Sequence, residues 1–360
     1  MIDAVAVFNP GSSNLKIGIF SANDLRELYR YQVPSVDVAS EKLLNPTDIE
    51  IKAIGYRVVH GGREFTEPVK IEDGVLEKLK ALIPLAPLHQ PQSIAVIEKM
   101  VKSHPDIPHI ACFDTAFHHT NSELERSFAL PLSFRNEGIE RYGFHGISYQ
   151  YIASVLPQIA GEKAYGKVIV AHLGSGASMC AMENLKSKAT TMGFSTLEGL
   201  MMGTRSGSLD PGVILHLIQQ KKISIEDVSN LLYHNSGLKG VSGISADMHE
   251  LEKSDKPEAK FAIELFCYQA ARHLGSLVMC LGGLDVLVFT AGIGEHSSLI
   301  RQKICKYLEW LGVEIDKPLN ESNASFIGGK SNKVGIYVIP TDEEKIIAAS
   351  CQKCLFPALA

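Results

Sequence analysis

A strand–turn–strand pattern that occurs once in each half of the chain constrains the fold most strongly. The first copy has β-rich apolar runs at 4–8 and 15–20 on either side of a polar turn at 9–14. The second copy, at 167–182, surrounds the turn Gly174-Ser175-Gly176. Such runs joined by a glycine-containing turn predict hairpins, and 360 residues exceed one ordinary hydrophobic core. The repetition therefore predicts a duplicated α/β chain with two domains.

Each turn also has the composition of a phosphate-binding turn. Gly11 lets the backbone approach an anion, and the turn amides together with Ser12 and Ser13 can donate to phosphate oxygens. Lys16 follows as a point charge. A single turn of this kind is more often ordinary hairpin chemistry. Two of them, one in each half, indicate a polyphosphate held from two sides.

The composition argues against several classes of protein. With 45% hydrophobic and 21% charged residues, the chain is predicted to be soluble and globular. A net charge of −5 without a basic run argues against nucleic acid as a partner. The longest apolar run, 274–290, contains glycines and Asp285, so it predicts a helix end, a turn and a buried strand instead of a membrane span. The start of the chain lacks the basic region of a signal peptide.

The cysteines point to a reducing compartment. There are seven, an odd number with scattered spacing, which favours reduced thiols and a cytoplasmic location. Cys351 and Cys354 form a lone C-x-x-C pair near the end of the chain. Because no second pair accompanies them, we interpret them as residues on a helix face, not as a metal or redox site.

The rest of the chain alternates predicted strands with predicted helices. Strands are expected at 53–60, 109–113, 286–290 and 334–340. Helices are expected at 73–84, 92–102, 149–156, 213–221, 225–234, 257–281 and 297–310, with a last helix capped by 341–344. Polar or Gly- and Pro-rich connections are expected at 21–47, 85–91, 195–212 and 240–247. The predicted domains are 1–116 together with 341–360, and 117–340.

Two strand ends and one loop are the predicted sites of chemistry. Asp114 directly follows the predicted strand 109–113, and the carboxyl ends of buried α/β strands are where ligands usually bind. The predicted strand 286–290 leads into a glycine turn at 291–295, where a nucleotide could bind the backbone and a helix N-terminus. The loop 195–212 is too rich in Gly and Ser for a regular element and carries Arg205 and Asp210.

Set in order, these segments resemble the acetate kinase family. The resembling blocks are FNPGSSNLK, YRVVHGG, PLAPLHQP, CFDTAFHHT, RYGFHGISY, AHLGSGAS, TLEGLMMGTRSGSLDPG, GVSGISAD, FTAGIGEHS and PTDEEKIIA, which span residues 8–348. The resemblance implies an α/β, duplicated two-domain sugar kinase/actin-like fold, each domain a mixed β-sheet flanked by helices, with the active site in the cleft between. The same fold occurs in heat-shock chaperones. The segment between Lys16 and Arg57 is shorter than is usual in the family.

The resemblance also implies the reaction and its partners. We expect reversible, Mg²⁺-dependent in-line phosphoryl transfer between ATP and acetate, giving acetyl phosphate and ADP. Mn²⁺ is the other possible ion. Family members are usually homodimers, so the partners expected are acetate or acetyl phosphate, an adenine nucleotide and a second copy of the chain, with neither nucleic acid nor membrane.

Four residues match the catalytic positions of the family: Arg57, Asp114, His145 and Arg205. The planar forks of the two arginines suit a carboxylate and a phosphoryl group held side by side. His145 would stabilise the transition state by donating to the transferred phosphoryl group. Asp114 is expected to orient groups on the acetate side, because acetate is already ionised at neutral pH and needs no base. An isolated arginine is more often part of a surface ion pair, and an isolated histidine is more often a packed core residue. The sequence blocks around Arg57, Arg205 and His145 favour the catalytic roles instead.

The acetate and metal positions follow from the same blocks. Arg57, Val59, Leu88 and Phe144 match the substrate site, where the apolar residues surround the acetate methyl group. A fourth wall position, usually proline, is Thr196. The metal positions are matched by Asn9 and Glu343, whose oxygen atoms suit Mg²⁺. Glu343 could equally be only a helix cap. His89 is in the loop beside the acetate site, and His60, His118 and His119 are interpreted as structural.

The nucleotide positions include the departures from the family. The matched residues are Lys16, His172, Gly174, Ser175, Gly176, Asp247, His249, Gly292, Ile293, Gly294 and Glu295. Ser175 stands where Asn is usual, His249 where Arg is usual and His296 where Asn is usual. Arg63 and Glu64 also depart after the glycine pair. The transfer residues are intact, whereas the nucleotide contacts are altered.

Two alternatives stay open at this point. The first is a sister carboxylate kinase that acts on propionate or another short-chain acid, or that uses a different phosphoryl donor. The second is an ATPase of the actin and chaperone type that works by cleft closure. That function would use the phosphate turns but has no need for Arg57 and Arg205 beside a methyl-sized pocket. Neither the physiological direction nor the oligomeric state follows from the sequence itself.

Overall fold

The computed structural model describes residues 1–10, 15–34, 48–330 and 333–356. Two compact units make up the chain. Unit 1 comprises Met1–His119, Phe144–Tyr151 and Asp342–Ala360, and unit 2 comprises Thr120–Gly143 and Ile152–Thr341. The predicted domain boundaries remain a proposal about which segments fold independently. No helix within the described ranges is long and apolar enough to cross a bilayer.

Unit 1 is built on a mixed sheet with the strand order β3-β2-β1-β4-β6-β5. Its strands are β1 (Ile2–Pro10), β2 (Leu15–Ser21), β3 (Glu27–Val33), β4 (Ile49–Val58), β5 (Val69–Lys70) and β6 (His109–Phe113). β1, β2 and β3 form an antiparallel meander, while β4 runs parallel to β1 and to β6. The first predicted hairpin is therefore confirmed, although its turn at 11–14 lies outside the described residues.

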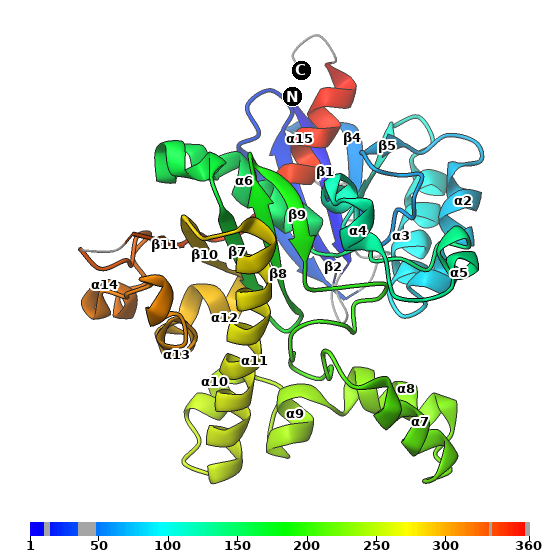
Figure 1. The fold of residues 1–360 in the computed structure, drawn as a ribbon. Helices are drawn as coiled ribbons and strands as arrows, with labels where there is room; N and C mark the ends of the chain where they lie inside the picture. Colours follow the sequence, from blue (N-terminus) through cyan, green and yellow to red (C-terminus); the bar gives the residue numbers. More distant parts are fainter. Residues whose placement is uncertain (11–14, 35–47, 331–332, 357–360) are drawn as a thin grey trace. The chain divides into compact units, whose positions relative to one another are not determined.

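Helices cover both faces of this sheet, and alternate side chains of β1 pack against the helices on each face. Ala4, Ala6 and Phe8 belong to a core cluster that includes residues of α2 (Val75–Ala81) and α3 (Gln90–Ser103). Val5 and Val7 belong to a second cluster with residues of α15 (Glu343–Leu355). Every residue of β1 from 4 to 8 is fully buried, as expected for a central strand with helices on both sides (Figure 1).

Unit 2 repeats the sheet topology of unit 1, with the strand order β11-β10-β7-β8-β9. Its strands are β7 (Val168–Leu173), β8 (Ala177–Glu183), β9 (Lys186–Thr190), β10 (Val286–Thr290) and β11 (Gly335–Val338). β7, β8 and β9 form the antiparallel meander, and β10 runs parallel to β7 and to β11. The meander and two parallel strands thus match β1–β2–β3, β4 and β6, which confirms the predicted duplication.

The helices of unit 2 surround this sheet and extend from it. They are α4 (Glu123–Arg126), α5 (Leu132–Asn136), α7 (Pro211–Gln219), α8 (Ile225–His234), α9 (Gly237–Ser242), α10 (Met248–Glu252), α11 (Pro257–Leu281), α12 (Ala291–His296), α13 (Ser298–Lys306) and α14 (Lys317–Glu321). α6 (Gly146–Ala160) begins in unit 1 and ends in unit 2. The long helix α11, yellow in Figure 1, packs against β7, β8 and β9. The 3₁₀ turns are Ile83–Leu85, Ala116–Thr120, Gly161–Tyr165 and Glu309–Leu311.

Most predicted elements are confirmed, and several predictions differ from the structure. The helix expected at 297–310 divides into α13 and a 3₁₀ turn, and the connection expected at 240–247 begins inside α9. The segment 21–47 was expected to be a connection, but it contains β3, in which Tyr29, Tyr31 and Val33 alternate with polar residues. The helix expected at 73–84 ends at Ala81, because Pro84 lacks an N–H donor and starts a separate 3₁₀ turn. The glycine turn expected at 291–295 is helical: it forms α12, whose first amide is capped by Glu295.

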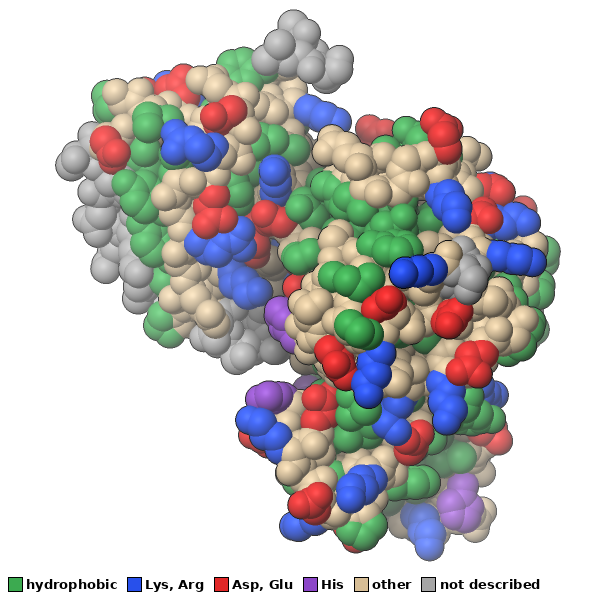
Figure 2. All heavy atoms as spheres, turned by 90° about the vertical axis from the view of Figure 1, so that its left-hand side faces the viewer, with side chains coloured by type: hydrophobic (Ala, Val, Ile, Leu, Met, Phe, Trp, Pro, Cys, Tyr) green, Lys and Arg blue, Asp and Glu red, His purple; other side chains and the backbone are tan. Residues whose placement is uncertain are grey.

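The surface and the thiols agree with the composition. Acidic and basic side chains are interspersed on the face of the described residues shown in Figure 2. All seven cysteines lie within the described ranges and are free thiols. Both members of the C-x-x-C pair lie on α15, where Cys351 is buried and Cys354 is exposed, so the interpretation as helix-face residues is confirmed.

Candidate active site

Arg57 and Asp114 form the centre of a buried polar site in unit 1. Arg57 is on β4, and Asp114 follows the neighbouring parallel strand β6, so their side chains leave the same end of the sheet. The Nε atom of Arg57 donates to both carboxylate oxygens of Asp114 at 3.1 and 3.0 Å, and Nη2 donates to Oδ2 at 2.7 Å. The side chains are 19% and 2% exposed. This two-pronged contact fixes the plane of the guanidinium group.

The charge of this pair is stabilised by its surroundings. Burial lowers the pKa of Arg57, but the carboxylates of Asp114, Glu343 and Glu344 raise it by more, so that the pKa lies above its ordinary value. Burial raises the pKa of Asp114, and the guanidinium group of Arg57 offsets this only in part, so that the pKa stays above its ordinary value. Arginine stays protonated, and its contact with both oxygens of Asp114, at 2.7–3.1 Å, has the geometry of an ion pair.

Backbone contacts join the two segments that carry this pair. The amide of Asp114 donates to the carbonyl of Val58 at 3.0 Å, and the amide of Gly61 donates to the hydroxyl of Thr115 at 3.0 Å. The fully buried side chain of Gln90 contacts the peptide groups of His60, accepting from its amide and donating to its carbonyl, both at 3.1 Å. The chain that follows Arg57 is therefore rigidly held against the chain that contains Asp114.

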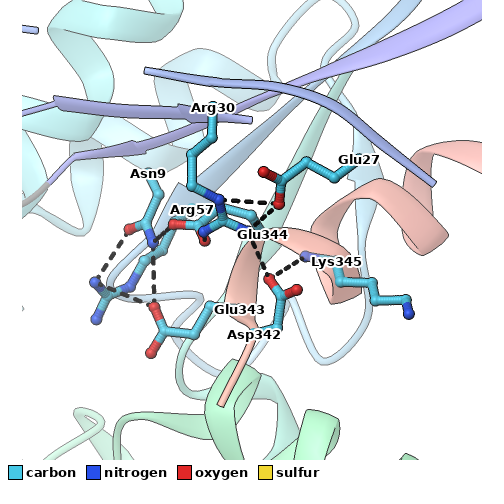
Figure 3. A network of polar contacts seen from close by, with 8 residues as sticks. All are labelled: Asn9, Glu27, Arg30, Arg57, Asp342, Glu343, Glu344 and Lys345. Atoms are coloured by element: carbon cyan, nitrogen blue, oxygen red, sulfur yellow. Dashed lines mark hydrogen bonds and ion pairs between the residues drawn. The ribbon is translucent and has the colours of Figure 1, made fainter. Parts of the chain in front are cut away.

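Asn9, Glu343 and Glu344 extend the site toward α15 (Figure 3). The side-chain nitrogen of Asn9, near the end of β1, donates to Glu344 Oε1 at 2.8 Å and to Glu343 Oε2 at 3.2 Å. Its oxygen accepts from Arg57 Nη1 at 3.3 Å. Glu343 Oε2 also lies 3.8 Å from Arg57 Nη1. The predicted metal residues Asn9 and Glu343 thus meet in space beside Arg57, although they are 334 positions apart in the sequence.

Two members of this network were missed by the sequence analysis. Glu344 is 4% exposed and adjoins the predicted residue Glu343, but only the fold shows which of the two contacts Asn9 more closely. Arg30 lies on β3, the strand that was expected to be a connection, and its Nη1 donates to Glu344 Oε2 at 2.6 Å. The alternation of Tyr29, Tyr31 and Val33 was the signal that could have revealed the strand.

His145 is held in an unusual backbone conformation next to Asp114. Its φ is 58°, in the left-handed region that non-glycine residues rarely adopt. The following amide, of Gly146, donates to the carbonyl of Asp114 at 2.8 Å. A Cβ atom at Gly146 would lie 2.2 Å from that carbonyl oxygen, so only glycine allows this approach. Such strain is frequent where a side chain must be placed for function.

His118 contacts the backbone of the same turn. Its Nε2 lies 3.0 Å from the carbonyl oxygen of Phe144, and burial lowers the pKa of His118 to about 4. Burial also lowers the pKa of His60 to about 4, and the His60 ring packs edge-on against the ring of Phe144 at 5.6 Å. Both imidazoles are therefore neutral near pH 7. Each contacts Phe144, which agrees with the interpretation of His60 and His118 as residues that support the structure.

The residues expected to surround the acetate methyl group differ in exposure. Val59 directly follows β4 and is 8% exposed, while Phe144 precedes His145 and is 1% exposed. Leu88 is 40% exposed, in the segment between the 3₁₀ turn and α3. Two apolar walls are thus packed into the core of unit 1 close in sequence to Arg57 and His145, whereas the third is a surface side chain.

The donor set of this site fits a magnesium ion held mainly by substrate. Mg²⁺ usually takes one or two protein carboxylates and completes its shell with phosphates and water. Within the described ranges, no group of three or more His, Cys, Asp or Glu is arranged to hold a metal ion. Glu343, with a side chain 14% exposed, fits the role of a single carboxylate ligand. Asn9, whose oxygen faces Arg57, fits the role of a hydrogen-bond donor better than that of a ligand.

Unit 2 contains a separate pocket of about 620 Å³ beside the second predicted phosphate turn. It is lined by Gly174, Ser175, Ala246, Asp247, Met248, His249, Glu252, Gly292, Ile293, His296 and Ser297. These come from the turn between β7 and β8, from α10 and the two residues before it, and from α12 and the residue after it. Six of the predicted nucleotide residues line it, together with the departing residue His296: Gly174, Ser175, Asp247, His249, Gly292 and Ile293.

Other predicted nucleotide residues have structural contacts. Glu295 Oε1 accepts from the amides of Ala291 at 2.8 Å and Thr341 at 3.2 Å, so it caps α12 and holds the chain before α15. Asp247 Oδ1 accepts from the amide of His249 at 2.8 Å and caps α10. His172 is 8% exposed on β7. Gly176 accepts from Gly174, and Gly294 is buried against the end of β10.

Lys16 and Arg205 occupy different units. In unit 1 the β1–β2 hairpin places Lys16 directly opposite Asn9, with its side chain exposed. In unit 2 the loop expected at 195–212 is irregular as far as Asp210, after which α7 begins, and Arg205 Nη1 donates to the carbonyl of Thr196 at 2.8 Å. The departure at Thr196 leaves this contact unaffected, because a backbone carbonyl is supplied by any residue. Asp210 caps α7.

Comparison with known proteins identifies the family of the chain. The sequence profile of the acetokinase family matches residues 35–349. The acetate kinase of Rhodopseudomonas palustris is 54% identical over 301 residues, which cover 83% of this chain and 76% of that protein. The chain belongs to the acetokinase family. That result confirms the resemblance drawn from the sequence blocks.

Solved structures of this family have the same fold. A propionate kinase from Francisella tularensis superposes with a TM-score of 0.91 at 34% identity, covering 98% of this chain and all of that one. An acetate kinase from Porphyromonas gingivalis gives a TM-score of 0.89 at 33% identity, with the same coverage. The predicted fold class, a duplicated sugar kinase/actin-like α/β chain with two mixed sheets, is confirmed.

Proposed function

We propose that this protein is an acetate kinase that transfers a phosphoryl group reversibly and in line between ATP and acetate. The observation that supports this most directly is the buried Arg57–Asp114 pair beside the apolar residues Val59 and Phe144, in a chain of the acetokinase family. A fixed guanidinium group next to a small apolar wall is the arrangement needed to bind a short carboxylate by both of its ends.

Arg57 is the proposed anchor for the acetate and the phosphoryl oxygens. Its Nε and Nη2 atoms are engaged by Asp114, whereas the contacts of Nη1 with Asn9 and Glu343 are longer, at 3.3 and 3.8 Å. Nη1 is therefore the donor that we assign to substrate oxygen. Asp114 orients the guanidinium group and takes no proton, since acetate reacts as its carboxylate.

His145 and Arg205 are proposed to neutralise charge on the transferred group. Phosphoryl transfer demands little covalent chemistry from the protein and depends on positioning and on charge stabilisation in the transition state. The left-handed backbone of His145, which brings it beside Asp114, supports its role. The role of Arg205 rests on its sequence block.

The nucleotide and the metal are assigned from the same family membership. The pocket beside Gly174 and Gly292 is proposed to hold the adenosine part of ATP, since its volume suits a nucleoside. Glu343 is proposed to contribute to Mg²⁺ binding, with Mn²⁺ as a substitute. When bound, the ion would neutralise phosphate charge. The chain's own contribution is to hold Glu343, Asn9 and Arg57 in fixed relation.

A matrix of acids against phosphoryl donors tests this proposal. Acetyl phosphate formed from acetate, ATP and Mg²⁺ would be trapped with hydroxylamine and measured as the hydroxamate. Formate, propionate and butyrate would replace acetate, and GTP, ITP and pyrophosphate would replace ATP. We expect acetate with ATP to give the highest kcat/KM. Activity that is independent of any carboxylic acid would contradict the proposal and favour an ATPase.

Propionate is the second candidate substrate. The solved structure with a TM-score of 0.91 is that of a propionate kinase, and Thr196 replaces a proline that is usual at the fourth wall position. Both observations bear on the size of the acyl site and leave the transfer residues unchanged. The propionate column of the matrix separates the two substrates, because a kcat/KM for propionate above that for acetate would reassign the enzyme.

The oligomeric state and location are proposed from the family resemblance and the thiols. A homodimer is expected from the resemblance, and light scattering coupled to gel filtration would test it. A cytoplasmic location is supported by seven free cysteines, five of which are buried.

A further inference from the structure

Arg30 connects the outer part of the unit 1 sheet to the proposed active site. It lies on β3, where Nε and Nη2 donate to Glu27 Oε2 at 3.0 and 2.7 Å. On the other side, Nη1 donates to Glu344 Oε2 at 2.6 Å, and Nη2 lies 3.4 Å from Asp342 Oδ1. The Glu344 side chain is 6% exposed, whereas that of Arg30 is 40% exposed. A surface arginine thus neutralises a buried glutamate at the start of α15.

Glu344 packs over a glycine in the neighbouring strand. Gly18 on β2 lies directly opposite Arg30 in the β2–β3 register. A Cβ atom at Gly18 would lie 3.5 Å from Glu344 Cβ and 2.5 Å from the ring of Phe20. The first turn of α15 therefore lies directly over the sheet at this point. Arg30 and Glu344 are held at short range by backbone packing as well as by their charges.

Both oxygens of Glu344 are used, one by Arg30 and the other by Asn9. Glu344 Oε2 accepts from Arg30, and Oε1 accepts from Asn9 Nδ2 at 2.8 Å. With its nitrogen toward the two glutamates, the amide of Asn9 must direct its oxygen the other way, toward Arg57 Nη1. The amide can adopt only this orientation, because reversing it would place an oxygen against two carboxylates and a nitrogen against a guanidinium group.

We propose that Arg30 and Glu344 are positioning residues for the phosphoryl-transfer site. Their ion pair fixes the amide of Asn9, and that amide fixes the Nη1 end of Arg57, whose other end is fixed by Asp114. This inference rests on the proposed function for its kinetic effect. The contacts run from the surface of the sheet to the buried aspartate in the order Arg30, Glu344, Asn9, Arg57 and Asp114.

A competing explanation is that the pair only attaches α15 to the sheet. In that case its loss would lower thermal stability and the amount of folded enzyme, while the folded fraction kept its normal turnover. A positioning role instead lowers kcat in enzyme that is fully folded, because a small displacement of Arg57 weakens transition-state contacts. The two explanations are separated by measuring kcat per folded molecule.

The first experiment compares Arg30→Gln, Glu344→Gln and the double variant at 25 °C in the hydroxamate assay, with circular dichroism melting to establish the folded fraction. We expect each single variant to lose about tenfold to 100-fold in kcat, with KM for ATP within about threefold. The double variant should lose no more than Glu344→Gln alone, because both changes break one chain of contacts. Normal kcat in both folded single variants would overturn the proposal.

Two matched controls remove charge nearby without breaking the chain. Glu27→Gln removes a carboxylate from Arg30 but leaves the contact with Glu344. Arg26→Gln removes an exposed arginine next to the same strand, 3.9 Å from Asp24. Both should keep kcat within about threefold of the unaltered enzyme. In addition, millimolar guanidinium should restore part of the kcat of Arg30→Ala and leave Arg26→Ala unchanged.

The second experiment observes Arg57 directly and does not require turnover. In ¹⁵N-arginine-labelled protein, the Arg57 Nε–H resonance would be assigned by its loss in Arg57→Lys. The proposal predicts that Glu344→Gln and Arg30→Gln shift this resonance and accelerate its exchange with water by at least about tenfold, whereas Glu27→Gln does not. An unchanged Arg57 resonance would overturn the proposal. If the unaltered enzyme transferred phosphate to no acid, the proposed function would fail, and this measurement would still decide the positioning role.

Discussion

The site in unit 1 and the pocket in unit 2 are built in different ways. In unit 1, charged and amide side chains from β1, β3, β4, the end of β6 and α15 contact one another directly, and most of them are largely buried. The pocket in unit 2 is lined largely by glycines and small or apolar residues, with His249 and His296 exposed at its surface. The unit 1 site is a network of hydrogen-bonded side chains, whereas the unit 2 site is a pocket defined mainly by the shape of its lining.

The difference predicts how each site responds to substitution. In a network, changing one member leaves a buried partner unsatisfied, at a cost of several kcal/mol for a charged group. On a shaped surface, a changed side chain alters one contact and leaves the others intact. Ser175, His249 and His296, the nucleotide positions that the resemblance marks as departures, all line the unit 2 pocket, so we expect these departures to be tolerated there.

The largest effect is expected from removing an arginine. Arg57→Ala should lower kcat by at least about 100-fold, and Arg205→Ala should do the same, because each removes a few kcal/mol of transition-state stabilisation. Steady-state kinetics on folded protein tests this, with Arg26→Ala as an exposed control in unit 1. If both variants turned over normally, the assignment of the active site would be wrong.

A smaller loss of kcat is expected when a side chain is introduced at Gly146, which contacts the backbone of Asp114. In Gly146→Ala the new Cβ atom would lie 2.2 Å from the Asp114 carbonyl oxygen, so the backbone at His145 must move. We expect kcat to fall by about tenfold or more, together with a lower melting temperature. Gly275→Ala, on α11 with nothing within 4 Å of the new atom, is the matched control and should be neutral or stabilising by up to about 1 kcal/mol. Equal behaviour of the two variants would contradict the proposed placement of His145.

A change in substrate preference is expected from enlarging the acyl wall. Val59→Ala removes two methyl groups from a side chain that is 8% exposed, which should make room for the additional carbon of propionate. The ratio of kcat/KM for propionate to that for acetate should rise by about tenfold. Leu88→Ala is the comparison in the more exposed wall, where a smaller rise is expected. An unchanged ratio in Val59→Ala would show that Val59 does not line the acyl site.

The smallest effect is expected in the unit 2 pocket. His249→Arg should lower KM for ATP by about threefold and leave KM for acetate nearly unchanged, because arginine adds a permanent charge and a flat face to the pocket. Comparison of ATP, GTP, ITP and pyrophosphate at constant Mg²⁺ measures how selective the unaltered pocket is. We expect weak discrimination. A low-micromolar KM for ATP together with strong rejection of the other donors would argue that neighbouring groups already compensate.

The parts of the structure that the sequence predicted are those that depend on local pattern. The hairpins, the buried strands 109–113 and 286–290, and the helices 225–234 and 257–281 each have a clear apolar period or a capping residue. The two missed features depend on partners distant in the sequence. The local alternation at 29–33 could have revealed β3, but only the packing of α15 over the sheet brings Glu344 to Arg30, 314 positions away in the sequence, and to Asn9.

The pairing of the first strand with the last helix has a consequence for how the protein is made. Asn9 leaves the ribosome before any residue of unit 2, but its partners Glu343 and Glu344 emerge only after all of unit 2 has been translated. Unit 2 is by then available to fold, whereas the sheet of unit 1 still lacks α15, whose residues complete one of its two cores. A nascent or truncated chain that ends before Asp342 therefore lacks Glu343, Glu344 and the rest of α15, and we expect it to be inactive because the proposed phosphoryl-transfer site cannot form.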